Sequence, residues 1–260
     1  MKAHEYLGGA RADDDAWTFD LERKFHGGFG GAFGGIITAC TLIAARPLVP
    51  DRVVTSVDCR FLRGIPAGTV RVEPRLIHQG RSLASVLVDV TDERGKLAAH
   101  SALSFTDPAA LTKIDSPSAS LAPEGGWKSH ADGKRWKMPP GVEIPILETL
   151  DPRSVGRSEL GSAWAIPVPW DEPLAGAEAA CMAADLCVGP PVAGALTDGW
   201  VPHPNPDLSL RFAGEVTTPH VVGVGKLERI QAGVAAVSIS VFSGAEVVAK
   251  GISTSLLLAT

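Results

Sequence analysis

The stretch "HGGFGGAFGGIITACTLIAARPL", residues 26–48, decides the fold, because a cluster of glycines runs directly into an apolar segment. Clustered glycines indicate tight turns or a close approach of the main chain to a ligand. A phosphate-binding P-loop is excluded, since Ile36 follows Gly35 where a lysine is required. A dinucleotide-binding fingerprint is excluded as well, because Phe33 stands in place of its third glycine. The glycines therefore need another explanation.

The segment after the glycines, residues 36–48, is apolar on nearly all sides, which predicts a helix buried in the core. Pro47 and Pro50 end it. The sequence that follows alternates apolar and polar residues, a pattern typical of β-strands. Four strands are predicted, at residues 53–62, 70–80, 81–92 and 97–105. One buried helix and four antiparallel strands predict a curved sheet wrapped around the helix.

The second half of the chain repeats this order of elements. At an offset of 151 residues, Arg60-Phe61 matches Arg211-Phe212, Val90 matches Val241 and Ala98 matches Ala249. Residues 156–170 can supply a first strand and residues 172–186 a helix. The same offset places Gly34 and Gly35 on Asp185 and Leu186. Because identities are few, chance similarity between two antiparallel units is the alternative, but the order of elements favours a duplication.

The region between the two units differs in composition. Residues 107–135 are rich in proline, serine, glycine and charge, which is typical of a linker. The domain boundaries predicted from this change are an N-terminal domain at 1–108, a linker at 109–155 and a C-terminal domain at 156–260.

The composition restricts the classes of function. The chain has 260 residues, of which 45% are hydrophobic and 20% charged, and its net charge of −5 argues against a nucleic-acid partner. Residues 27–45 are uncharged, but glycines in their first half argue against a membrane span. The beginning of the sequence has no apolar signal segment, and the four cysteines form no metal-binding motif. We expect a cytoplasmic protein with free thiols and no metal, cofactor or membrane partner.

Three motifs of the first half are distinctive: "FGG" at the start of the helix, "FLRGIPAG" after the first long strand and "QGRSLASV" in the third. With them, this half resembles the acyl-CoA thioesterase II family. The resemblance is weaker in the second half, where "AADLCVGPP", "PNPDLSLRF" and "VVAKGISTSLLL" carry it. The resemblance implies an α+β fold of two tandem hotdog domains, each an antiparallel sheet wrapped around a central helix, side by side. It also implies hydrolysis of acyl-CoA to a free fatty acid and CoA.

The resemblance implies that Asp185 is the catalytic carboxylate, which would activate a water molecule. In the family a threonine and a glutamine accompany this carboxylate, and here Asn205 and Ser253 stand at the matching positions. Both residues depart from the family pattern. Because serine is shorter than glutamine, it is open whether the Ser253 side chain can reach the water molecule. Gly34 and Gly35, at the start of the first helix, are candidates to polarise the thioester carbonyl with their backbone N–H groups.

Each of these residues also has a purely structural interpretation. Asp185 could cap the start of the second helix, and the glycines could serve only tight packing of the loop. Asn205 lies in "HPNPDL", a stretch that partly resembles the active-site motif of a hydratase. In this chain, however, the histidine precedes Asn205, whereas in the hydratase motif it follows.

Two further residues are expected at the substrate. Arg81 in "QGRS" could contact the CoA phosphates, because a guanidinium suits phosphate geometry, or it could be a surface residue on a bulge. His26, beside the glycines, could line the site or be structural. Arg60 and Arg63 are expected on a solvated face of a strand.

Three functions remain open on this basis. The favoured one is an acyl-CoA thioesterase. The alternatives are a catalytically weak or inactive acyl-CoA-binding hotdog protein and, less favoured, an enoyl-CoA hydratase or dehydratase. Pairing of double-hotdog chains into a homo-oligomer is a further possibility.

Overall fold

The computed structural model describes residues 1–12, 14–116, 122–124, 126–136, 143–172, 175–196 and 201–259. Its helices are α1 (Ala3–Tyr6), α2 (Gly34–Ala45), α3 (Pro145–Leu150), α4 (Gly176–Leu186) and α5 (Gly189–Ala193), with 3₁₀ turns at Arg23–Phe25, Arg46–Leu48 and Pro108–Ala110. Its strands are β1 (Gly9–Arg11), β2 (Trp17–Leu21), β3 (Val53–Phe61), β4 (Gly68–Gln79), β5 (Leu83–Thr91), β6 (Leu97–Thr106), β7 (Lys134–Arg135), β8 (Arg153–Ser158), β9 (Gly161–Pro167), β10 (Asp207–Phe212), β11 (His220–Gln231), β12 (Val234–Ser243) and β13 (Glu246–Leu256).

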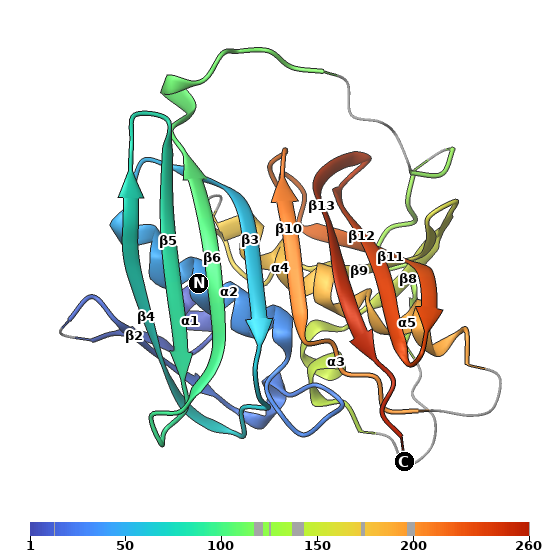
Figure 1. Ribbon diagram of the computed structural model, residues 1–260. Helices are drawn as coiled ribbons and strands as arrows, with labels where there is room; N and C mark the ends of the chain where they lie inside the picture. Colours follow the sequence, from blue (N-terminus) through green and yellow to red (C-terminus); the bar gives the residue numbers. More distant parts are fainter. Residues whose placement is uncertain are drawn as a thin grey trace.

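The strands form one sheet in which the two halves of the chain are mirrored. Its order is β1-β2-β4-β5-β6-β3-β10-β13-β12-β11-β9-β8-β7, so β4-β5-β6-β3 in the first half has its counterpart in β11-β12-β13-β10 in the second. The halves join where β3 and β10 pair antiparallel, with Cys59 opposite Leu208 (Figure 1). This mirrored order follows the repeat predicted from the sequence.

The helices α2 and α4 lie together against one face of this sheet (Figure 1). Every residue of α2 from Gly35 to Ala45 is buried, as the apolar pattern predicted, and Pro47 lies in the 3₁₀ turn that follows it. The start of α2 contacts the end of α4 through Gly35 and Asp185, while Arg46, just after α2, contacts Glu178 near the start of α4. The two helices are therefore antiparallel.

The ion pair between Arg46 and Glu178 is bidentate, with distances of 2.6 and 2.9 Å, and the Glu178 side chain is fully buried. Arg46→Ala leaves this carboxylate buried without its cation, so we expect the free energy of unfolding to fall by about 2 kcal/mol, less than for a fully buried pair because Arg46 is partly exposed. Urea denaturation measures the change. Arg23→Ala, which breaks an exposed pair with Glu143, should cost at most ~0.5 kcal/mol. Equal losses in the two variants would contradict this prediction.

Several elements were not predicted. The segment before the glycines forms α1, β1 and β2, and β2 extends the sheet beside β4. Within the predicted linker, α3 packs back on the first half through a hydrogen bond from the Ile146 N–H to the His26 carbonyl oxygen, 2.9 Å long. The strand β8 begins at Arg153, ahead of the predicted boundary at 156. The remainder of the predicted linker, at 117–121, 125 and 137–142, lies outside the described residues, and the domain boundaries stay a prediction.

The four cysteines are free and buried, as expected from their apolar surroundings. Among the residues that the structure describes, no helix combines the length and the apolar character needed to cross a membrane.

Candidate active site

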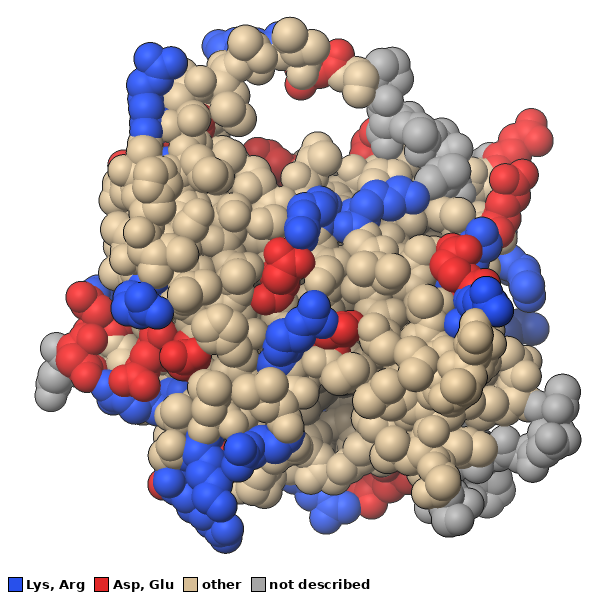
Figure 2. Space-filling model, in the orientation of Figure 1, with Lys and Arg blue, Asp and Glu red and all other residues tan. Residues whose placement is uncertain are grey.

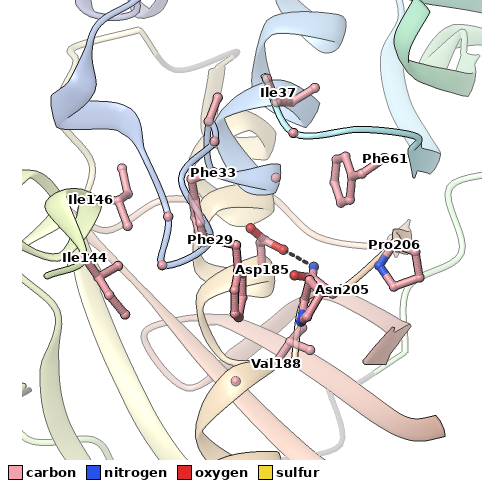
Figure 3. A pocket seen from close by; sticks show the side chains of 18 of the residues that line it. Phe29, Phe33, Ile37, Phe61, Ile144, Ile146, Asp185, Val188, Asn205 and Pro206 are labelled. Carbon is pink, nitrogen blue, oxygen red and sulfur yellow. Dashed lines mark hydrogen bonds between the residues drawn. The ribbon is translucent and has the colours of Figure 1, made fainter. Parts of the chain in front are cut away.

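A cavity of about 630 Å³ opens between the two halves of the chain. Its walls come from the glycine-rich loop, the end of β3 with the loop after it, the first residues of α3, the junction of α4 with α5, and the loop that leads into β10. Most of these side chains are apolar, among them Phe29, Phe33, Ile37, Phe61, Ile144 and Ile146 (Figure 3). The glycine cluster and part of the predicted linker thus form one wall of a site whose other wall is the second half.

Asp185 is the carboxylate of this cavity, and it is almost completely buried, with 4% of its surface exposed. Its Oδ2 atom accepts a hydrogen bond of 2.7 Å from the backbone N–H of Gly35. Its Oδ1 atom accepts one of 2.5 Å from the Nδ2 group of Asn205 (Figure 3). Three residues that are distant in the sequence are therefore held together at the surface of an apolar cavity.

Burial raises the pKa of Asp185 to about 6, against an ordinary value of 3.8. The hydrogen bonds from Asn205 and Gly35, and the nearby backbone N–H of Gly34, favour the charged form and limit this rise. A carboxyl with a pKa near 6 is ionised at neutral pH, yet basic enough to accept a proton from water. The position suits a general base.

The repeat offset implied that Asp185 starts the second central helix, but in the structure it does not. It lies in the last turn of α4, one residue before the helix ends at Leu186, and a new short helix begins at Gly189. The interpretation of Asp185 as an N-cap is therefore wrong. Pro190 and Pro191 lie at the start of the new helix, where the chain has broken from α4. The carboxylate projects toward the start of α2, so the positive end of that helix, not its own, faces it.

The amides of Gly34 and Gly35 lie at the start of α2, as predicted, but the Gly35 amide has a different partner. Its N–H group donates to the Asp185 carboxylate instead of facing the cavity, so the expectation that it polarises a thioester carbonyl is corrected. Gly35 acts on Asp185 as a positioning group. Gly34 lines the cavity and also stabilises the charged form of Asp185 through its backbone.

Ser253 is not brought to this cavity. It lies on β13, is buried, and its hydroxyl donates to the carbonyl oxygen of Asp207 at 2.6 Å. This bond ties β13 to the start of β10, which is the strand that follows Asn205. Ser253 thus supports the loop that carries Asn205 without contacting Asp185.

His26 and Arg81 also lie away from the cavity lining. His26 is buried, and its carbonyl oxygen anchors α3, which agrees with the structural interpretation. Arg81 is exposed in the turn between β4 and β5. Arg63 is exposed, as the sequence predicted, but it lies in the loop after β3 rather than on the strand, and it also lines the cavity.

Two further aromatic residues of the cavity, Phe29 and His203, were not predicted. Phe29, at the tip of the glycine-rich loop, meets the ring of His203 edge-on with centroids 6.2 Å apart. His203 is buried, and its Nδ1 atom lies 2.6 Å from the carbonyl oxygen of Val201. The only sequence signal for either was position, Phe29 among the glycines and His203 two residues before Asn205.

Comparison with known proteins agrees with this architecture. The family model described as the acyl-CoA thioesterase N-terminal domain matches residues 23–106. No curated protein sequence matches the chain. The resemblance to the acyl-CoA thioesterase II family, drawn from the sequence motifs, is confirmed by this family match over residues 23–106, and the solved structures that follow share the fold.

Three solved structures illustrate the similarity of fold. The tesB protein of Mycobacterium avium subspecies paratuberculosis has a TM-score of 0.76 at 18% identity, with 98% of this chain and 97% of that chain covered. The acyl-CoA thioesterase II TesB2 of Mycobacterium marinum has a TM-score of 0.72 at 18% identity, covering 100% and 98%. A conserved protein with a hot dog fold from Alicyclobacillus acidocaldarius has a TM-score of 0.75 at 17% identity, covering 100% and 99%. The predicted α+β double hotdog fold is confirmed.

Proposed function

We propose that this protein is an acyl-CoA thioesterase that hydrolyses acyl-CoA to a free fatty acid and CoA. The observation that carries the proposal is the buried Asp185 carboxylate, held by Gly35 and Asn205 at the wall of an apolar cavity between the halves. An apolar cavity suits an acyl chain, and a carboxylate with a raised pKa suits the activation of water. The family match of residues 23–106 supports the same activity.

The reaction follows from the hydrogen bonds of Asp185. Each carboxylate oxygen accepts one bond from the protein and keeps a lone pair for a water molecule. Asp185 takes a proton from that water as its oxygen attacks the thioester carbonyl carbon. The carbon–sulfur bond then breaks, and the thiolate of CoA receives the proton from Asp185. Acid and thiol leave, and the carboxylate is restored.

Asn205 has a second part in this scheme. Its Nδ2 group carries two N–H bonds, of which one is given to Asp185. The second can stabilise the negative charge that develops on the carbonyl oxygen, because Asn205 lines the cavity. It would take the task that was predicted for the amides of Gly34 and Gly35.

The decisive experiment is to measure release of free CoA thiol from a panel of acyl-CoA substrates, with enoyl absorbance recorded in parallel. We expect thiol release with no enoyl signal. Enoyl absorbance that changes without thiol release would establish the hydratase alternative. Binding of acyl-CoA with neither signal would establish a binding protein and overturn the proposal.

Activity should depend on pH through Asp185. Because its pKa is raised to about 6, the carboxylate is protonated and inactive as a base at lower pH. We expect kcat/KM for a saturated acyl-CoA to rise between pH 5 and pH 7, with a midpoint near the pKa of Asp185. A flat profile over this range would contradict the assignment of Asp185 as the base.

The role of Asn205 can be tested by replacing it with valine and with threonine, whose side chains are nearly equal in shape. Asn205→Val removes the hydrogen bond to Asp185, and kcat/KM should fall about 100-fold. Asn205→Thr restores a hydroxyl donor, as in the family pattern, and should stay within about tenfold of the original enzyme. The Val variant should also shift the pH midpoint upward, because a bond that lowers the pKa of Asp185 is lost. Equal activity of the two variants would argue against a donor role.

The four buried free cysteines support the expectation of a reducing compartment such as the cytoplasm. Pairing of two double-hotdog chains stays a prediction, which light scattering of the purified protein can test.

A further inference from the structure

Three basic residues lie on two neighbouring loops beside the cavity, Arg63 after β3 and Arg94 and Lys96 in the turn before β6. Arg63 lines the cavity directly, and the backbone N–H groups of Leu62 and Arg63 donate to the carbonyl oxygen of Ala98, at 2.8 and 3.3 Å. Ala98 is the second residue of β6 and also lines the cavity. The turn just before β6 carries Arg94 and Lys96, both exposed. Figure 2 shows basic side chains gathered at the lower left, where the turn between β5 and β6 lies in Figure 1.

The carboxylates of this turn are engaged by main-chain groups. The Asp92 Oδ1 atom accepts hydrogen bonds from the N–H groups of Arg94 and Lys96, and Glu93 accepts one from the N–H of Thr69. The backbone bond from Lys96 lowers the pKa of Asp92 most, and the charges of Arg63 and Lys96 lower it further, so these cations share one region. Within the described part of the chain, no ion pair joins Arg63, Arg94 or Lys96 to a carboxylate.

Other arginines near the cavity or on the strand before it are paired. The pairs are Arg60 with Asp207, Arg211 with Asp58 and Arg23 with Glu143. Arg63, Arg94 and Lys96, called the rim cations below, thus offer a patch of unpaired positive charge beside the cavity, on a protein whose net charge is −5. Such a patch attracts an anionic group to the edge of the cavity.

We propose that the rim cations bind the 3′-phosphate and the diphosphate of CoA, while the thioester reaches Asp185 inside the cavity. The inference rests on the proposed function. CoA carries its phosphates at the end opposite the thioester, so they remain at the edge when the acyl chain enters the apolar space. Arginine binds phosphate through two parallel N–H bonds, and lysine adds a point charge.

This assignment replaces Arg81, the residue that the sequence suggested for the phosphates. Arg81 precedes β5, while Arg94 and Lys96 follow it, so the full strand separates them. A strand of this length spans roughly 30 Å at about 3.3 Å per residue. Arg81 therefore lies at the end of β5 remote from the cavity.

The test compares two double variants that each remove two positive charges. Arg63→Ala/Arg94→Ala removes rim cations, while Arg75→Ala/Lys113→Ala removes exposed cations elsewhere. Calorimetric titration measures the affinity for CoA, for dephospho-CoA and for pantetheine. We expect the rim variant to bind CoA about tenfold or more weakly, with a reduced salt dependence, and to bind pantetheine unchanged. The control variant should match the original protein with all three ligands.

The outcomes separate two claims, the phosphate site at the rim cations and the proposed thioesterase function. If the original protein hydrolyses acyl-CoA but the rim variant binds CoA as tightly, the phosphate site is wrong and the proposed function stands. Loss of CoA affinity in Arg81→Ala instead would also overturn the rim assignment. If the original protein hydrolyses neither acyl-CoA nor acyl-pantetheine, the proposed function fails. The difference between the rim and control variants in binding CoA then still decides the phosphate site.

Discussion

Asp185→Asn is expected to lower kcat/KM for acyl-CoA hydrolysis by about a thousandfold or more, because the amide cannot accept a proton from water. The substitution keeps the shape of the side chain. Its oxygen can still accept the Gly35 N–H bond, and Asn205 can rotate its amide to present an oxygen to the new NH₂ group. The fold should therefore survive, and the loss should appear in kcat with acyl-CoA binding retained.

The same variant should be more stable than the original protein at alkaline pH. The pKa of Asp185 is raised from 3.8 to about 6 by folding, so stability is fully present below pH 4 and is lost as the pH rises through 6. At about 1.36 kcal/mol per unit, the ionised carboxylate costs about 3 kcal/mol at pH 8. A neutral asparagine removes this cost at pH 8, whereas at pH 4 the two proteins should be nearly equal. Urea denaturation at both pH values measures the difference.

Asp58→Asn is the matched control, because it removes an exposed carboxylate that pairs with Arg211. It should leave kcat/KM and the pH dependence of stability unchanged. Retained activity in Asp185→Asn would show that Asp185 is not the general base. A lower stability than that of the original protein at pH 8 would show that ionised Asp185 does not destabilise the fold. The combination of lost activity and gained stability is the expected mark of a functional site.

Gly35→Ala is expected to lower the free energy of unfolding by about 4 kcal/mol or to prevent accumulation of folded protein. A Cβ atom at Gly35 would lie 2.7 Å from the Met182 Cα atom and 2.9 Å from the Cys181 carbonyl oxygen. Both are main-chain atoms of α4, so the two central helices would have to separate. That movement would also break the hydrogen bond from Gly35 to Asp185.

Gly64→Ala provides the control, because nothing lies within 4 Å of a Cβ atom at that glycine. Its stability in urea should stay within about 0.5 kcal/mol of the original protein. Where Gly35→Ala yields folded protein, kcat/KM should fall about 100-fold, since Asp185 loses the amide that positions it. Equal stability of the two variants would mean that α2 and α4 are not packed as closely as the structure shows.

Much of the fold was predictable from the sequence, because local patterns record it. The apolar run at 36–48 corresponds to α2 with its 3₁₀ turn, and the alternating segments from 53 to 105 correspond to β3 through β6. The short elements α1, β1 and α3 were missed because three to six residues carry no measurable periodicity. The second central helix was predicted at 172–186, but the repeat offset misplaced its start at Asp185, because glycine and two prolines break it after Leu186.

The candidate site was predictable only in part. Asp185 and Asn205 were found through motifs, and the structure joins them by a hydrogen bond. The position of Ser253 followed from the same motifs, yet its hydroxyl bonds to the main chain of β10. Arg81 was chosen for its chemistry, but a single residue in a turn carries no information on which end of the sheet holds the cavity.

The sequence by itself determined that this chain would form two antiparallel units, each with a buried helix, because hydrophobic periodicity is a local property. Through the family resemblance it also placed the candidate carboxylate, Asp185, in the second unit. Only the tertiary structure decided that Gly35 would hold that carboxylate and that Arg63 would reach the cavity. These contacts join residues up to 150 positions apart, and they depend on the close antiparallel packing of α2 on α4, which no local pattern encodes.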